Sequence, residues 1–117
     1  MDRSSLKREY RQAGRPMGVY GITDTVNNTI YIGYGTDVQA RLNRHRAELK
    51  FGNHRTRKLQ EAWNESGEPA FLFEVLDVLD PEKDSEADPG EELRTLAEMW
   101  IQKMEKAGNS VEGFLFR

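Results

Sequence analysis

The sequence predicts an α+β domain, within the broad α/β class, in which helices flank a small three-stranded antiparallel sheet. Residues 18–35 form two β-branched, aromatic-rich runs on either side of Asn27-Asn28, an order typical of a hairpin because asparagine tolerates the positive φ of a tight turn. Residues 69–79, PAFLFEVLDVL, have the composition of a third strand. Helix start and stop signals fill the segments between and after these strands.

The chain has room for one compact domain, since it contains 117 residues. We expect a basic N-terminal extension at residues 1–16 and the domain itself at residues 17–117. There is no apolar run long enough to cross a bilayer and no apolar stretch typical of a secretory signal. The chain contains no cysteine, which excludes disulfides, thiolate zinc sites and cysteine nucleophiles. These features predict a cytoplasmic protein without a membrane partner.

Three helices are expected in the domain. Residues 36–39 have the form of a capping box, which opens a helix that Gly52 closes. A second helix is expected at about residues 56–66, with Gly67 as its stop. The last is expected at about residues 91–106, and the polar first 15 residues predict a short basic helix before the domain.

Charge is divided unevenly along the chain. Residues 1–58 contain 12 Lys and Arg against 5 Asp and Glu, whereas residues 59–117 contain 5 against 15. A basic first half favours a polyanionic partner such as DNA, although charged runs are more often solvated faces. Residues 80–92 carry seven acidic residues and two prolines and predict an exposed acidic loop. An autoinhibitory flap over the basic helix is a less favoured interpretation of this loop.

Two groups of side chains converge in the predicted fold. A turn at Asn27-Asn28 pairs the two strands so that the residue numbers of directly opposed residues add up to 55. Every second residue of each strand then lies on the same face of the sheet. On the helix that follows, Arg41 and His45 are four residues apart and share a face. A guanidinium can clamp a phosphate and an imidazole can exchange a proton, but without other evidence such a pair is more often an ordinary feature of an exposed helix. The residues expected on the sheet face are Tyr20, Ile22, Asp24, Tyr31, Gly33 and Gly35.

The order of these residues resembles the GIY-YIG nuclease superfamily. Residues 18–20 and 31–33 match its two tripeptides, and Arg41 and His45 follow at the family's spacing. The resemblance extends over the LQ-x-x-W segment and the aromatic-Ile pair of the last helix, and it is greatest to phage and intron homing endonucleases.

The resemblance implies hydrolysis of DNA phosphodiester bonds with one divalent cation, Mg²⁺ or Mn²⁺. It implies catalytic roles for Tyr20 and Tyr31 around the attacking water, for Arg41 at the scissile phosphate and for His45 in proton transfer. Orientation and cations directed at the phosphate oxygens are what phosphoryl transfer requires. The resemblance also implies that His54 is a secondary substrate contact, and Arg44 and Lys50, which add positive charge to the same helix, are expected to contact the substrate as well.

The sequence departs from the family where the metal ligand is expected. The family's glutamate, three residues before the aromatic of the last helix, corresponds to Ala97, which has no oxygen to offer a cation. Glu98 is adjacent, but helical phase turns it away from the apolar face that contains Ala97. Leu115 stands where the family has a late asparagine.

Two functions therefore remain open. The first is a metal-dependent endonuclease domain, catalytically impaired by the change at Ala97. The alternative is a DNA- or protein-binding module on the same fold that does not cut. Cleavage of both DNA strands by one site would favour a homodimer or sequential nicks.

Overall fold

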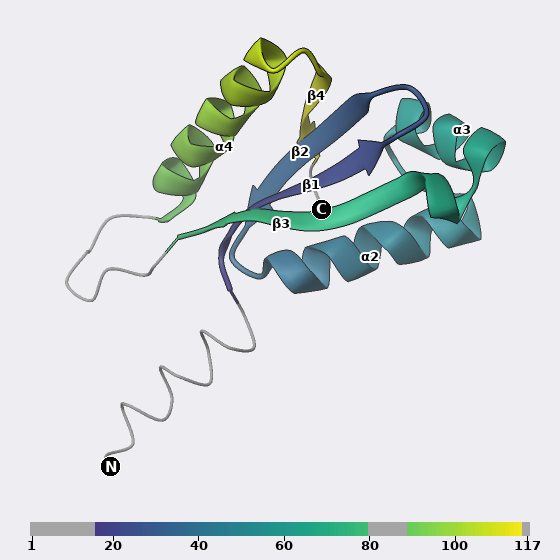
Figure 1. The fold of residues 1–117 in the computed structure, drawn as a ribbon. Helices are drawn as coiled ribbons and strands as arrows, with labels where there is room; N and C mark the ends of the chain where they lie inside the picture. The colour runs from purple at the N-terminus through teal and green to yellow at the C-terminus, as the bar shows by residue number, and fades with distance from the viewer. Residues whose placement is uncertain (1–15, 80–88, 116–117) are drawn as a thin grey trace.

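The computed structural model describes residues 16–79 and 89–115, which build a four-stranded sheet in the order β3-β1-β2-β4 with helices on both faces (Figure 1). Strands β1, β2 and β3 are antiparallel, as predicted, and β4 runs parallel to β2. The elements are β1 (Gly18–Asp24), β2 (Thr29–Gly35), α2 (Val38–Phe51), α3 (Arg57–Ser66), the 3-10 helix η1 (Glu68–Ala70), β3 (Phe71–Val78), α4 (Pro89–Lys106) and β4 (Ser110–Leu115).

The prediction of three strands is wrong by one, because β4 completes the sheet beside β2. Its partner strand is about 80 positions earlier in the chain, with Thr29 opposite Ser110, so no local signal announces a parallel pairing. The expected basic helix at residues 1–15 lies outside the described residues, as do residues 80–88 of the expected acidic loop. The last four residues of that loop, 89–92, form the first turn of α4.

The hairpin between β1 and β2 turns through four residues, 25–28, rather than two. The Asp24 carboxylate fixes this turn: it accepts hydrogen bonds from the backbone N–H groups of Val26 and Asn27, at 3.0 and 3.2 Å, and from the Asn27 side chain at 2.7 Å. Asn28 takes the left-handed conformation, with φ 54°, which asparagine tolerates better than most residues.

The longer turn changes the predicted pairing by two positions. Tyr20 is opposite Gly33 and Ile22 is opposite Tyr31, so paired positions sum to 53 rather than 55. Because side chains alternate across a strand with a period of two, this shift leaves every side chain on its predicted face. Tyr20 and Tyr31 therefore do share one face of the sheet.

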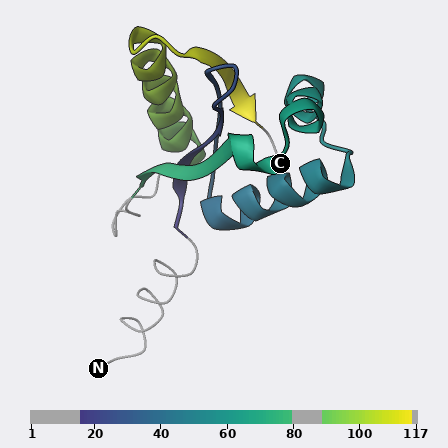
Figure 2. The same ribbon diagram turned by 45° about the vertical axis from the view of Figure 1, so that its right-hand side comes forward.

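The helices divide between the two faces of the sheet. Helix α2 lies along one face and α4 against the other, as the two ribbon views show (Figures 1 and 2). The Asp37 side chain caps α2 by accepting the Ala40 N–H at 3.1 Å, and Gly52 ends it with φ 82°. Glycine is suited to that position because it has no Cβ to oppose the left-handed conformation.

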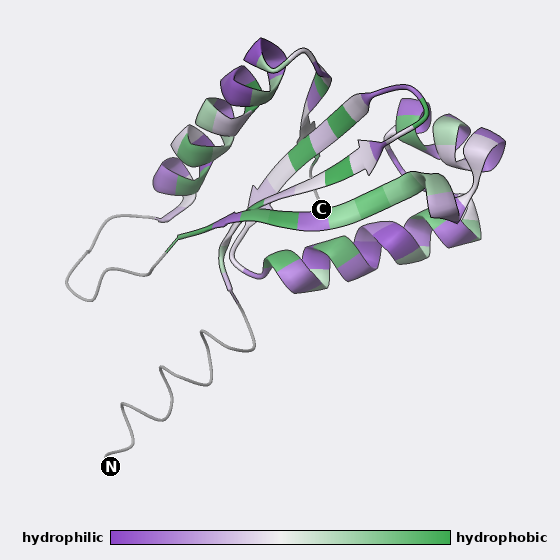
Figure 3. Ribbon diagram, viewed as in Figure 1, coloured by the Kyte–Doolittle hydropathy of each residue, from purple (hydrophilic) through white to green (hydrophobic). Residues whose placement is uncertain are grey.

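The sheet consequently has a separate apolar core on each face, and green, hydrophobic segments occur both on its strands and on the helices that cover them (Figure 3). In the described residues, no helix combines the length and apolar character needed to span a membrane. The buried cluster under α2 and α3 comprises Tyr20, Ile22, Tyr31, Val38, Leu42, Leu49, Leu59, Trp63, Phe71 and Leu115. The cluster under α4 comprises Val19, Ile30, Ile32 and Ala97.

Candidate active site

Tyr20 lies at the centre of the face that α2 covers, and its side chain is fully buried. Its hydroxyl is 2.8 Å from His45 Nε2 and donates to the Leu115 carbonyl oxygen at 3.4 Å. The ring fits because the opposed residue is Gly33: a Cβ there would lie 2.5 Å from the Tyr20 hydroxyl oxygen. The glycine of the second tripeptide thus provides the space that the tyrosine of the first one fills.

Arg41 reaches the same face from the first turns of α2. Gly35 makes room for it, since a Cβ at Gly35 would overlap the Arg41 side chain. Burial raises the pKa of Tyr20 to about 12, while the positive charge of Arg41 and its hydrogen bond to Tyr20 act in the opposite direction. Arg41 and Arg44 also line an open hollow of about 180 Å³ at the start of α2. Arg41 can therefore act on the phenol and on a ligand in the hollow.

Two histidines continue the contact away from Tyr20. His45 Nδ1 is 2.8 Å from His54 Nε2, and both rings are buried. Burial lowers the pKa of His45 to about 4, and the neighbouring His54, Arg41 and Arg44 add to this effect. Burial also lowers the pKa of His54, against an opposing effect of Glu48. Both imidazoles are therefore neutral near pH 7.

The segment that carries His54 is held by Gln60 of α3. The Gln60 side chain accepts the backbone N–H of His54 at 2.9 Å and donates to the Leu49 carbonyl at 3.1 Å and to the Asn64 side chain at 3.0 Å. The Thr56 backbone N–H donates to His54 Nδ1 at 3.0 Å. These bonds fix the position and the rotation of the His54 ring.

Tyr31 shares the face with Tyr20 and is also buried. It lies opposite Glu112 across the parallel pairing of β2 and β4. Burial raises the pKa of Tyr31 to about 12, and the negative charges of Glu112 and Asp24 add to this effect. Lys58 of α3 forms an ion pair with Glu112 at 2.6 Å.

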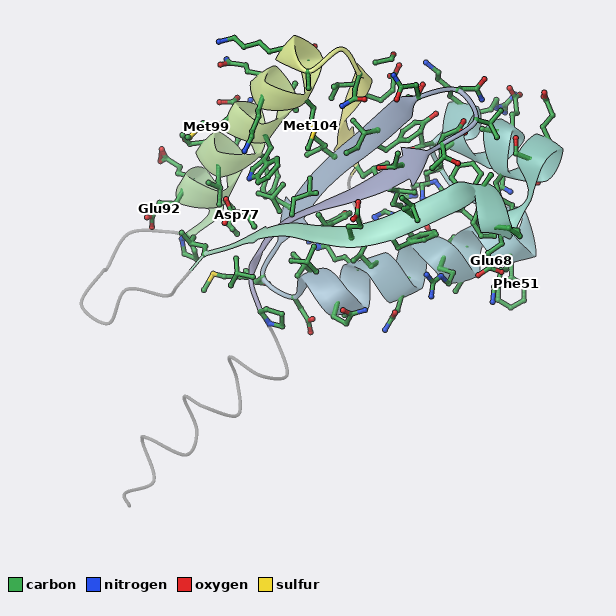
Figure 4. All side chains as sticks on the ribbon, in the orientation of Figure 1. Phe51, Glu68, Asp77, Glu92, Met99 and Met104 are labelled. Atoms are coloured by element: carbon green, nitrogen blue, oxygen red, sulfur yellow. The ribbon has the colours of Figure 1, made fainter. Side chains whose placement is uncertain are left out.

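The three residues expected to contact the substrate lie in three different environments. Arg44 is exposed, pairs with Glu48 at 3.6 Å and lies beside Arg41 in the hollow. Lys50, at the far end of α2, pairs at 3.7 Å with Glu68, which is labelled beside Phe51 in Figure 4. His54 is buried against His45. Their contacts with a substrate remain predictions.

The structure places position 97 on the other face of the sheet from the tyrosines. Ala97, on the sheet-facing side of α4, is fully buried against Val19, Ile30 and Ile32, and its side chain has no oxygen to offer a cation. Glu98 is exposed and pairs with Arg94, one turn earlier, at 3.5 Å. The described residues at this position therefore do not fit a magnesium ion.

One other group of side chains in the described part of the chain places metal-ligand atoms together. His45, Glu48 and His54 each offer one ligand atom, and these atoms lie within 4.8 Å of one another. Two nitrogens and one oxygen suit a borderline ion such as Zn²⁺ better than Mg²⁺, which prefers oxygen ligands. This group does not supply the all-oxygen site that Mg²⁺ or Mn²⁺ favours.

Sequence reasoning missed three residues that shape the site: Glu48, Gln60 and Glu112. Glu48 follows His45 by three positions, and that helical spacing was the available signal. Gln60 lies in the LQ-x-x-W segment, where a polar residue on the same helix face as an apolar pair indicates a buried hydrogen bond. Glu112 joins the face only through β4, which gave no local signal.

With this geometry established, comparison with known proteins identifies the family. The sequence pattern of the GIY-YIG catalytic domain matches residues 16–85, and the chain belongs to the GIY-YIG family. Intron-associated endonuclease 1 of Enterobacteria phage T4 is 37% identical over 67 residues, which cover 57% of this chain and 27% of that protein. The chain therefore matches only about a quarter of the length of this relative.

Solved structures show the same relationship. The catalytic domain of the homing endonuclease I-TevI is 27% identical with a TM-score of 0.63, and the match covers 84% of this chain and 99% of that chain. A glutamate-to-alanine mutant of the catalytic domain of intron endonuclease I-TevI is 28% identical with a TM-score of 0.64, over 87% and 97% of the two chains. The chain is thus a GIY-YIG nuclease domain similar to that of I-TevI.

Proposed function

We propose that this chain hydrolyses DNA phosphodiester bonds, and that it does so slowly because no described group of its residues, Ala97 included, fits Mg²⁺ well. The observation that carries the proposal is the convergence of Tyr20, Arg41 and His45 on one sheet face in a GIY-YIG fold. The relatives are named endonucleases, which supports a nucleic-acid substrate.

The proposed roles of Arg41, Arg44 and Tyr20 follow from the chemistry of their side chains. Arg41 presents a permanently charged planar fork toward the hollow at the start of α2, where it can hold a phosphate through two hydrogen bonds. Arg44, at the rim, adds a second positive charge. Burial raises the pKa of Tyr20 to about 12 and Arg41 only partly offsets this effect, but once ionised the phenolic oxygen can accept a proton from water.

A divalent ion, Mg²⁺ or Mn²⁺, belongs to the proposal because of the family. Such an ion would neutralise charge that develops on the phosphate oxygens. No described group of residues fits it well, since Ala97 is apolar and faces away from the tyrosines. The chemistry of this chain is therefore derived from its own side chains alone.

The test is nicking of supercoiled plasmid DNA with Mg²⁺ or with Mn²⁺, and with a chelator as the blank. We expect Arg41→Ala to lower the nicking rate by about 100-fold or more, as removal of a transition-state donor does elsewhere. Arg94→Ala is the matched control, because it removes the same charge from an exposed position on α4. Equal rates for both variants would contradict the proposal. The ratio of nicked to linear product further distinguishes single cuts from cleavage by a homodimer.

A substitution at position 97 tests whether this position can take part in catalysis. In the structure, a carboxylate placed there would be buried among Val19, Ile30 and Ile32, so we expect Ala97→Glu to lower the melting temperature without raising the nicking rate. A faster Ala97→Glu enzyme would show that α4 can deliver this side chain to the tyrosine face.

The second candidate is a DNA-binding module without catalysis, favoured by Ala97 and by Leu115 at the position of the family's asparagine. It would bind DNA with an affinity that falls steeply as salt increases, and removal of Arg41 and Arg44 would flatten that dependence. Binding that is insensitive to salt would indicate a protein partner instead. Failure of the unmodified chain to nick, combined with retained DNA binding, would select this candidate.

A further inference from the structure

The hydrogen bonds around the two buried histidines determine where their protons lie. A backbone N–H can only donate, so the bond from Thr56 N to His54 Nδ1, at 3.0 Å, requires an unprotonated Nδ1. A neutral imidazole carries one proton, and in His54 it must therefore be on Nε2. Because burial lowers the pKa of His54, the neutral form is the relevant one.

The same reasoning passes from His54 to His45. The protonated Nε2 of His54 is 2.8 Å from Nδ1 of His45, so it donates and Nδ1 accepts. Neutral His45 then carries its own proton on Nε2, which is 2.8 Å from the Tyr20 hydroxyl oxygen. His45 is consequently a donor to the phenol, and the Tyr20 hydroxyl hydrogen points to the Leu115 carbonyl oxygen. One backbone amide thus sets the direction of four consecutive hydrogen bonds.

We propose that His54 is a positioning residue that, held by the Thr56 amide, keeps His45 in the tautomer that donates to the oxygen of Tyr20. This inference rests on the proposed function and assigns His54 a role other than contact with the substrate. It involves no proton transfer by either histidine. Two donors, His45 and Arg41, then act on one phenolic oxygen and favour its ionised form over the protonated one.

The opposite tautomer of His45 would have the opposite effect. With its proton on Nδ1, His45 would accept the Tyr20 hydroxyl hydrogen at Nε2 and favour the protonated phenol. Nothing within the His45 ring itself selects between the two forms. The selection comes from His54, in the way that a partner on the distal nitrogen fixes the tautomer of other catalytic and metal-bound histidines.

The same amide argues against a metal ion at His45, Glu48 and His54, although their ligand atoms lie close together. A metal ion at His54 Nε2 would require that nitrogen to give up its proton, and a neutral ring would then carry it on Nδ1. The Thr56 N–H already occupies Nδ1 as a donor, so two hydrogens would oppose each other there. In the native chain the donor network and the metal site exclude each other.

The decisive experiment is ¹⁵N NMR of the full chain with labelled histidines. The chain contains two histidines, so substitution of one of them assigns the signals of both rings. We expect both rings above pH 7 to show an unprotonated Nδ1 and a protonated Nε2. Thr56→Pro removes the amide hydrogen at a residue whose φ of −79° suits proline. This variant should show a mixed tautomer at His45. Thr56→Ala keeps the amide and loses a side chain that makes no capping hydrogen bond, so it should match the native pattern.

Three results of this experiment would overturn the proposal. The first is a native His45 with its proton on Nδ1. The second is a Thr56→Pro variant that melts cooperatively yet keeps the native tautomers at both rings. The third is a shift of both histidine signals when Zn²⁺ is added to the native chain, because it would make the pair a metal site. None of these measurements requires cleavage activity, so they stand even if the proposed function fails.

Cleavage provides the second readout. His54→Gln retains an N–H donor near His45, whereas His54→Phe fills the space without one. We expect His54→Phe to lower the nicking rate by about tenfold or more and His54→Gln to recover part of that loss. Equal loss in both variants, with the native tautomer of His45 preserved, would assign His54 to substrate contact and overturn the positioning role.

Discussion

The neutral, buried His45 predicts a specific loss of stability in acid. In the folded chain its pKa is lowered from 6.5 to about 4, by burial and by the neighbouring His54, Arg41 and Arg44. Between these two pH values His45 is protonated in the unfolded chain and neutral in the folded chain, so the free energy of unfolding rises with pH. The contribution is complete above about pH 6.5 and is lost as the pH falls toward 4.

The size of this loss follows from the two pKa values of His45. The difference between 6.5 and about 4 corresponds to roughly 3 kcal/mol in the free energy of unfolding, of which about 2.5 kcal/mol is lost by pH 4.5. That is a substantial share of the 5–15 kcal/mol that is ordinary for a domain, roughly speaking.

The assay is urea unfolding of the native chain and of His45→Gln at pH 7.5 and at pH 4.5. Carboxylates titrate in both chains, and the comparison between the chains removes their effect. We expect the native chain to lose about 2 kcal/mol more than the variant over this interval. An equal loss in the two chains would refute the argument, because it would mean that His45 is protonated as readily in the fold as in the unfolded chain.

Three further perturbations follow from the packing. Gly33→Ala places a methyl group 2.5 Å from the Tyr20 hydroxyl oxygen, so it should destabilise the chain by about 1–3 kcal/mol in urea unfolding; unchanged stability would mean that the phenol has room to move. Gln60→Met leaves the His54 N–H and the Leu49 carbonyl without their partner, and each unpaired buried group should lower the stability by about 1–3 kcal/mol. An unchanged melting temperature would contradict this expectation. Trp100→Phe removes the 2.9 Å bond from the indole to a carboxylate of β3 and reduces the ring that Lys103 contacts, so it should destabilise the chain by about 1–3 kcal/mol in urea unfolding; unchanged stability would contradict this accounting.

Most of the fold was predictable from local patterns. The alternation of β-branched and aromatic residues identified β1 and β2, and Gly52 and Gly67 marked the ends of α2 and α3. The shared face of Tyr20 and Tyr31 followed from strand alternation and survived the error in the turn, since that error was two positions long.

What could not be predicted depends on contacts between distant segments. The parallel pairing of β4 with β2 joins residues about 80 positions apart and has no turn of its own. Which face of the sheet each helix covers is also a property of the whole chain, and it separates Ala97 from the tyrosines. The contact between His45 and His54 depends on the short segment that Gln60 anchors, whose path no periodicity specifies.

The position of β4 has a practical consequence for anyone who produces this protein. Its residue Leu115 accepts a hydrogen bond from the hydroxyl of Tyr20, so a version of the chain shortened before Leu115 would leave that phenol without this partner. Versions of the chain made for the measurements above should therefore keep β4 whole.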